Sequence, residues 1–202
     1  MQKRKRMLGD AHPSTLISMG NLALTYSNQD RWREAETLQV HMVQTTKRVL
    51  GDAHPDTLRS MSYLAQTYSD QGRCNEAEEL QEQVLKTTKR VLGDEHPDTL
   101  ASMANVALTY WKQGRWREAE KLQVQVLQTR KRVLGEEHPE TMLSMHNLAF
   151  TLDSYSRNED AITLLEKCFQ LRKHVLGSQH PDTVLSLEAL NQWRLENPEI
   201  SN

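Results

Sequence analysis

The chain has 202 residues, of which 37% are hydrophobic and 26% charged, and its formal net charge is −2. This length is sufficient for a buried core, and the composition is too apolar for a disordered chain. The near-zero charge argues against bulk nucleic-acid binding, and no stretch approaches the roughly 18 apolar residues of a membrane helix. The two cysteines, Cys74 and Cys168, are far apart. This separation disfavours a disulfide framework or a zinc site and makes a reducing, cytoplasmic location the expectation.

Five His-Pro pairs divide the chain at a constant interval of 42 residues, and a Leu-Gly pair precedes each of them. The pairs are His12-Pro13, His54-Pro55, His96-Pro97, His138-Pro139 and His180-Pro181. A fixed period of this length indicates a repeat protein. We therefore divide the chain into residues 1–9, the tail of a truncated second helix, then repeats at 10–50, 51–92, 93–134 and 135–176, and a first helix with a tail at 177–202.

Each repeat predicts two helices, as the second repeat illustrates. Its first helix begins at Pro55, which suits the first helical position, and Asp56 lies near the positive end of the helix dipole. An apolar face with helical spacing follows at Leu58, Met61, Leu64, Ala65 and Tyr68, and residues 71–73 then break the helix. The second helix carries Ala77, Leu80, Val84, Leu85, Val91 and Leu92. Gly51 and its equivalents suit a left-handed residue just past a helix end.

Neither helix of a repeat can bury its apolar stripe alone, whereas stacked neighbours can. The sequence therefore predicts an all-α fold, an α-solenoid of antiparallel helix pairs with about four and a half repeats. The incomplete units at both ends suggest a piece of a longer array, cut inside repeats.

The repeat resembles the tetratricopeptide repeat (TPR). In the third unit the matching residues are Met103, Val106, Ala107, Tyr110, Gly114, Trp116, Glu118, Ala119 and Glu120. The 42-residue period with Leu-Gly-x-x-His-Pro-x-Thr between units is similar to the kinesin light chain type, which also occurs in fungal and bacterial NB-ARC or NACHT signalling proteins. The resemblance implies a TPR superhelix that serves as the sensor or scaffold part of a larger signalling protein. One departure is that Gln39, Gln81, Gln123 and Leu165 replace the expected aromatic of the second helix, which either loosens packing between units or places amides on a wetter groove.

The near-identical units reveal which positions are free to differ. In the first helices these positions form one stripe, which the resemblance assigns to a peptide-binding groove. Its members include Ile17, Leu24, Arg59, Gln66, Leu108, Trp111, Lys112, His146 and Phe150. An unconstrained surface stripe would be mostly polar, so its apolar and aromatic members favour a binding surface. The alternatives are solvent positions under weak constraint, or packing against the next unit.

Three asparagines, Asn21, Asn105 and Asn147, lie where peptide-binding TPR units often use Asn to bond the ligand backbone, and a solvated amide is the alternative. We expect apolar anchoring from Trp111, Leu108 and Phe150. We expect orientation from Asn105, Asn147, Arg59 and Lys112.

Catalytic chemistry is not expected. Five of the eight histidines occupy the same turn before proline, where they are interpreted as caps, and no phosphate-binding loop or nucleophile motif occurs. We expect a non-enzymatic module without cofactor or metal that binds a peptide or protein, and no nucleic acid or membrane. The rival hypotheses are a structural spacer or self-association through the open ends, an enzyme with a cryptic site, and single-stranded RNA binding, which the mixed charges disfavour.

Overall fold

The computed structural model describes residues 7, 9 and 11–200, the last without its side chain. This described part contains nine α-helices and one 3₁₀ helix and no strand, which confirms the all-α prediction. The helices are α2 (Pro13–Ser27), α3 (Trp32–Leu50), α4 (Pro55–Asp70), α5 (Cys74–Leu92), α6 (Pro97–Lys112), α7 (Trp116–Leu134), α8 (Pro139–Asp153), α9 (Asn158–Leu176), α10 (Pro181–Glu196) and η1 (Pro198–Ile200). The helix remnant expected at residues 1–9 lies, apart from Met7 and Gly9, outside the described residues.

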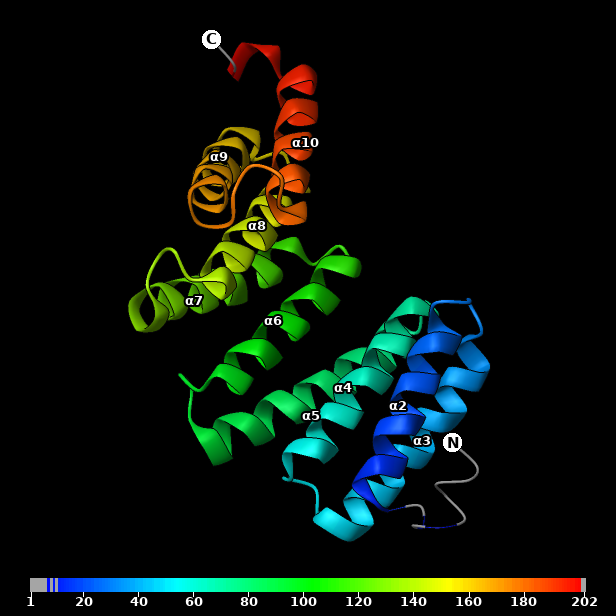
Figure 1. The fold of residues 1–202 in the computed structure, drawn as a ribbon. Coiled ribbons are helices and arrows are strands. Elements are labelled where there is room, and N and C mark those ends of the chain that lie inside the picture. The colour runs from blue at the N-terminus through cyan, green and yellow to red at the C-terminus, as the bar shows by residue number, and fades with distance from the viewer. Residues whose placement is uncertain (1–6, 8, 10, 201–202) are drawn as a thin grey trace. The chain divides into compact units, whose positions relative to one another are not determined.

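The chain divides into two compact units, Met1–Ser102 and Met103–Asn202. In the first unit, α2 and α3 form an antiparallel pair, and α3 also packs against α4, which pairs with α5 (Figure 1). Between these helices lies an apolar core of Val43, Leu58, Met61, Leu64 and Val84. The stacking therefore buries the stripe that no single helix could bury alone.

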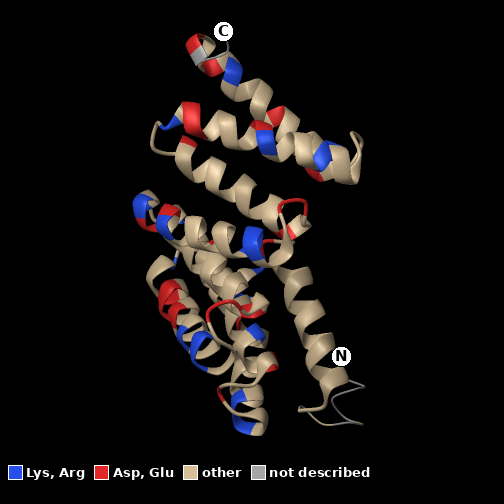
Figure 2. Cartoon of the chain, turned by 90° about the vertical axis from the view of Figure 1, so that its left-hand side faces the viewer, with Lys and Arg blue, Asp and Glu red and all other residues tan. Residues whose placement is uncertain are grey.

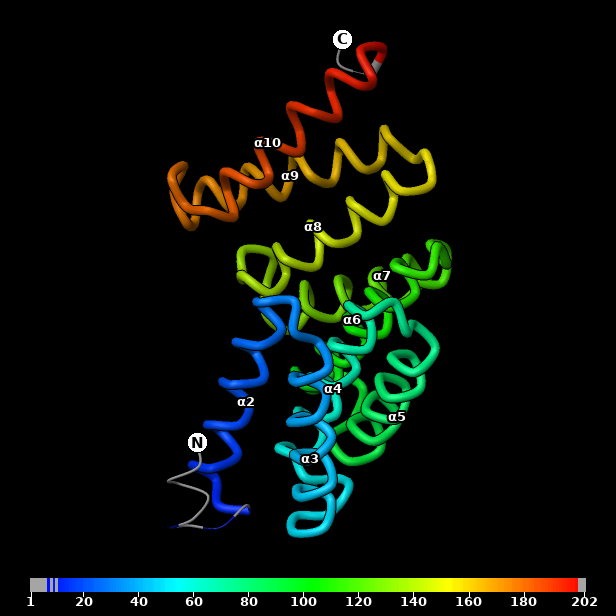
Figure 3. The backbone as a smooth tube through the Cα atoms, turned by 90° about the vertical axis from the view of Figure 1, so that its right-hand side faces the viewer, coloured from blue at the N-terminus to red at the C-terminus, as the bar shows by residue number. Residues whose placement is uncertain are grey.

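The second unit repeats this arrangement with α8 packed on both α7 and α9, and α9 on α10 (Figure 3). Its core includes Met142, Leu165, Cys168, Leu190 and Trp193. Cys168 is fully buried, and its Sγ donates to the Met142 carbonyl at 3.2 Å. Burial raises the pKa of this thiol, which disfavours the reactive thiolate.

The five His-Pro pairs begin the first helix of each repeat, as predicted. In each, the histidine Nδ1 accepts a hydrogen bond from the backbone N–H two residues later, at 3.1 to 3.2 Å. This satisfies one of the backbone donors that a helix N-terminus leaves unpaired, while proline occupies the next position without needing a partner for its nitrogen. The interpretation of these histidines as caps is confirmed.

The second helices end differently in detail from the expectation. Gly51 has the positive φ of 89° that glycine favours, but its ψ of 166° places it in the extended region at positive φ and not in the left-handed helical region. Val91, counted among the apolar face of its helix, is 48% exposed, because this last turn extends beyond the neighbouring core.

Candidate functional site

A cavity of about 570 Å³ opens in the first unit between α2 and α4, with α3 as its floor. Five of the predicted groove residues line it together: Ile17, Asn21 and Leu24 from α2, and Arg59 and Gln66 from α4. Helical spacing accounts for this, since residues three and four apart lie on one face of each helix.

The walls of this cavity are apolar and accessible. Ile17 is 58% exposed and Leu24 is 60% exposed, and both face the same opening. Tyr63, which the sequence analysis did not select, lines the opposite wall and is also exposed. Tyr63 occupies the repeat position that carries Asn21, Asn105 and Asn147 in the other repeats. This replacement of asparagine by an aromatic residue was the sequence signal that could have identified Tyr63 as a site residue.

The floor comes from the second helix, which the sequence stripe did not include. Gln39, Met42 and Thr46 line the cavity from α3 and are all buried. Gln39 is only 7% exposed, and its Oε1 has no hydrogen-bond partner. The Gln39 amide therefore lies largely buried at the floor of the cavity.

Polar side chains at the rim of the cavity pair with neighbours on the same helix. Arg59 Nη2 lies 2.6 Å from Asp56 Oδ1, and Gln66 Nε2 donates to Asp70 Oδ1 at 2.8 Å. Exposed pairs of this kind contribute little to stability. Arg59 balances the charge of Asp56, whereas the neutral Gln66 leaves the negative charge of Asp70 at the opening. Lys and Arg are interspersed with Asp and Glu along the described helices (Figure 2).

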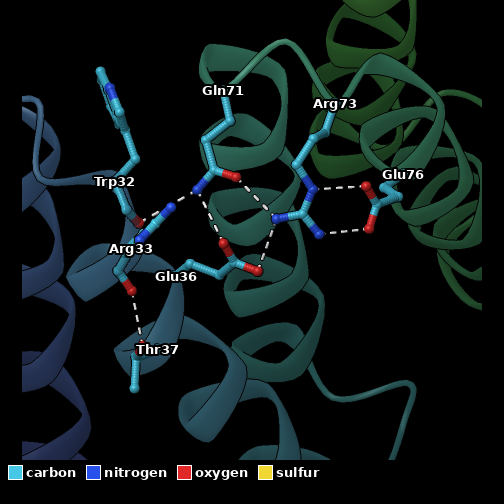
Figure 4. A network of polar contacts seen from close by, with 7 residues as sticks. All are labelled: Trp32, Arg33, Glu36, Thr37, Gln71, Arg73 and Glu76. Carbon is cyan, nitrogen blue, oxygen red and sulfur yellow. Dashed lines mark hydrogen bonds and ion pairs between the residues drawn. The ribbon is translucent and has the colours of Figure 1, made fainter.

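A polar network joins α3 to the turn between α4 and α5, and it includes the backbone carbonyl of Trp32, a residue that lines the cavity (Figure 4). Arg73 Nη1 donates to Glu36 Oε1 at 2.8 Å, its Nη2 lies 2.5 Å from Glu76, and its guanidinium stacks 4.0 Å above the Tyr68 ring. Burial raises the pKa of Glu36, but hydrogen bonds from Arg73 and Gln71 outweigh it and hold that pKa below its usual value. The network therefore favours one register of α3 against α4.

The predicted residues of α6 belong to the second unit. Leu108 is exposed, as is Lys112, while Asn105 is half-buried. Trp111 is also half-buried, and its indole Nε1 donates to Ser154 Oγ at 2.7 Å, so this anchor candidate already contacts the next repeat.

His146 and Phe150 of α8 are packed against other side chains of the second unit. The two rings lie 4.6 Å apart, and Phe150 packs against the buried Trp193 at 5.0 Å. Arg172 Nη1 lies 3.3 Å from His146 Nδ1. Burial, and then the charge of Arg172, lower the pKa of His146 to about 4. For these two side chains the structure corresponds to the alternative of packing against the next unit, while Asn147 beside them is half-buried.

No metal-binding cluster is evident in the described part of the chain. Within residues 11–200 no group of three or more His, Cys, Asp or Glu could hold a metal ion. Nor is any of the described helices long and apolar enough to cross a bilayer.

The tetratricopeptide repeat family model matches residues 15–56, 57–98, 99–140 and 141–182. A search of curated proteins found no match. Among solved structures, the kinesin light chain-like protein of Podosopora anserina with nearly identical TPR-like repeats is 32% identical, with a TM-score of 0.78 over 94% of this chain and 92% of that one.

Two further structures share the fold at lower identity. BtubC (BKLC) of P. vanneervenii is 19% identical, with a TM-score of 0.82 over 98% of this chain and 81% of that one. The apo form of RapI is 10% identical, with a TM-score of 0.70 over 96% of this chain and 73% of that one. These comparisons confirm a TPR-like solenoid.

Proposed function

We propose a function for this chain, which belongs to the tetratricopeptide repeat family. It is a non-catalytic interaction module that binds a peptide or protein segment in the cavity between α2 and α4. TPR arrays and TPR-like neighbours support a protein-interaction scaffold. We add three proposals to this scaffold role: the binding site, the peptide or protein ligand, and a sensor role in a signalling protein.

The observation that carries the proposal is the convergence of variable positions on one cavity. The repeat position shared by Ile17 and Arg59 and the one shared by Leu24 and Gln66 vary among the four repeats, whereas the position of Asn21 carries asparagine in three of the four. All five residues line the same opening. Packing fixes core positions across near-identical repeats, whereas these positions are released from packing. An apolar patch framed by polar residues is the usual composition of a protein-binding site.

The mechanism is docking onto a preformed surface. Ile17 and Leu24 supply apolar area that a ligand side chain removes from water, and the exposed Asn21 amide can donate to and accept from a peptide backbone. Because these residues lie on helices already fixed by the core and by the Arg73 network, little ordering is needed on binding. In the second unit Leu108, Lys112, Asn105 and Asn147 extend the candidate set, with Trp111 and Phe150 already engaged in packing.

A peptide-display selection on the whole chain tests the proposal. Peptides that bind the wild type are measured against the double variant Ile17→Ser/Leu24→Ser, which removes both exposed apolar side chains of the α2 wall without touching a buried residue. We expect at least about a 30-fold loss of affinity. The matched control is Val49→Ser, because Val49 is about equally exposed on α3 but does not line the cavity. Selected peptides that bind the double variant as tightly as the wild type would place the ligand elsewhere.

Self-association is the second candidate, because α10 leaves apolar side chains exposed at Val184, Leu185, Leu187 and Leu195. Light scattering over a range of protein concentrations distinguishes it. A dimer that Leu185→Ser/Leu187→Ser dissociates and Ile17→Ser/Leu24→Ser leaves intact supports this alternative.

A further inference from the structure

We infer that the cavity between α2 and α4 accepts a tyrosine side chain of the bound segment, whose hydroxyl completes the hydrogen bonding of Gln39. The inference rests on the proposed peptide-binding function and adds the chemistry that the ligand must carry.

The chain contains a second copy of this space, in which aromatic rings are already present. Three periods of 42 residues separate α2, α3 and α4 from α8, α9 and α10, so Gly20 corresponds to His146, Leu24 to Phe150 and Thr67 to Trp193. Gly20, Leu24 and Thr67 all line the cavity. Their three counterparts form a continuous aromatic contact, with ring centroids 4.6 and 5.0 Å apart. In the second unit, aromatic rings therefore occupy the space between the first helices α8 and α10 of two neighbouring repeats.

The same comparison explains why the first unit has an opening. Gly20 contributes no side chain, and Thr46 on the floor takes the place of Arg172, whose guanidinium reaches His146 Nδ1 and donates to Ser186 Oγ at 2.8 Å. Small residues leave about 570 Å³ in the first unit, within the usual range for ligand pockets.

The floor specifies the chemistry of the ring. Under the aromatic cluster of the second unit lies Leu165, which is fully buried and apolar, whereas its counterpart in the first unit is Gln39. Gln39 is 93% buried, lines the cavity, and has an Oε1 without a partner. A buried amide oxygen without a partner costs free energy that a hydrogen-bond donor of a ligand can recover. A hydroxyl both donates and accepts, so tyrosine satisfies this amide in either orientation, whereas phenylalanine does neither and an indole only donates.

The rim selects against a phosphorylated tyrosine. Arg59, the one basic side chain among the described residues that line the cavity, is bound to Asp56 at 2.6 Å, and Asp70 lines the same opening. A phosphate would meet two carboxylates and a guanidinium that is already paired, so the fit is to the unmodified side chain.

The test uses N-acetyl-tyrosinamide, N-acetyl-phenylalaninamide and the O-phosphorylated tyrosinamide as probes, titrated into the full chain. The readout is the methyl NMR signal of Met42, which lies on the cavity floor. We expect the tyrosinamide to move this signal and to bind about fivefold more tightly than the phenylalaninamide, and the phosphorylated probe to leave the signal in place.

Three variants separate the hydrogen bond from the shape of the cavity. Gln39→Leu installs the residue found in the second unit, and we expect it to remove the preference for tyrosine over phenylalanine. Gln81→Leu is the matched control, because Gln81 is equally buried with an unpartnered Oε1 but does not line the cavity. Gly20→His adds the side chain of repeat four and should block binding of both the tyrosinamide and the phenylalaninamide. A Cβ at Gly20 would meet only the Met42 methyl at 3.5 Å, an ordinary contact, so this variant should fold.

The inference is overturned if the phenylalaninamide binds wild type as tightly as the tyrosinamide, if Gln39→Leu keeps the preference, or if the tyrosinamide does not move Met42 at its solubility limit. Its failure is distinguishable from failure of the proposed function. Selected peptides that depend on Ile17 and Leu24 but carry no tyrosine would overturn only this inference, whereas a selection that yields no binding peptide would overturn the proposed function.

Discussion

His146 provides a sharp test of how the second unit is packed. Its imidazole lies against Phe150, with Nδ1 3.3 Å from Arg172 Nη1. Burial, and next the charge of Arg172, lower its pKa from 6.5 to about 4, while Asp182 opposes them weakly. Protonation would place a second cation beside a buried guanidinium.

The sign and size of the effect follow from the two pKa values. The folded pKa lies below the unfolded one, so the unfolded state binds more protons between about pH 6.5 and pH 4. The stability contributed by the neutral imidazole is therefore present above about pH 6.5 and decreases as the pH falls through that window. At about 1.4 kcal/mol per pKa unit the whole window corresponds to about 3 kcal/mol, of which about 2 kcal/mol is lost by pH 5.

The assay is urea unfolding followed by circular dichroism at about pH 7.5 and about pH 5, for the wild type and His146→Asn. Asparagine retains an acceptor for Arg172 but cannot titrate. The other histidines remain in both proteins, so the difference isolates His146. We expect the wild type to lose about 2 kcal/mol more than the variant on acidification. Equal losses, or an imidazole NMR signal from His146 that titrates above about pH 6, would refute the packing described for this side chain.

Three further predictions concern turns, caps and the α6–α8 contact. Ser156 and its equivalent Gly114 both have positive φ, 67° and 75°. We expect Ser156→Gly to stabilise the fold and Gly114→Ser to destabilise it, each by about 1 kcal/mol in urea unfolding, and no change in either would contradict the backbone assignment. His54→Ala should cost about 1 kcal/mol through loss of the α4 cap, with His54→Asn restoring most of it, and an equal loss in both variants would indicate another role. Trp111→Phe removes the donor to Ser154 and should lower stability by about 1 kcal/mol, whereas an unchanged midpoint would mean that this indole is solvated.

The fold could be predicted because the same two-helix sequence pattern recurs in each repeat. The His-Pro pairs mark the start of each first helix through proline geometry and a local side-chain cap, both of which depend only on neighbouring residues. By contrast, the ψ angle of Gly51 depends on how the chain enters the next cap, which spacing alone does not encode.

The candidate site was only partly predictable. Comparison of the repeats identified the α2 and α4 walls, because positions free of packing vary between units. It could not distinguish Leu24, which faces an opening, from its counterpart Phe150, which packs on Trp193, since that depends on the size of the residues opposite. The floor at Gln39 was not included because it belongs to the second helix, where the near-constant glutamine gave no contrast between units.

The central claim, that a ligand docks between α2 and α4, is tested most directly by methyl NMR of the full chain with a selected peptide. Met42 reports on the cavity floor, and Met142 and Met145 report on the core of the second unit. We predict that the peptide shifts the Met42 signal, leaves the signals of Met142 and Met145 in place, and no longer shifts Met42 in Ile17→Ser/Leu24→Ser. A peptide that shifts Met142 or Met145 while Met42 stays unperturbed would contradict the account.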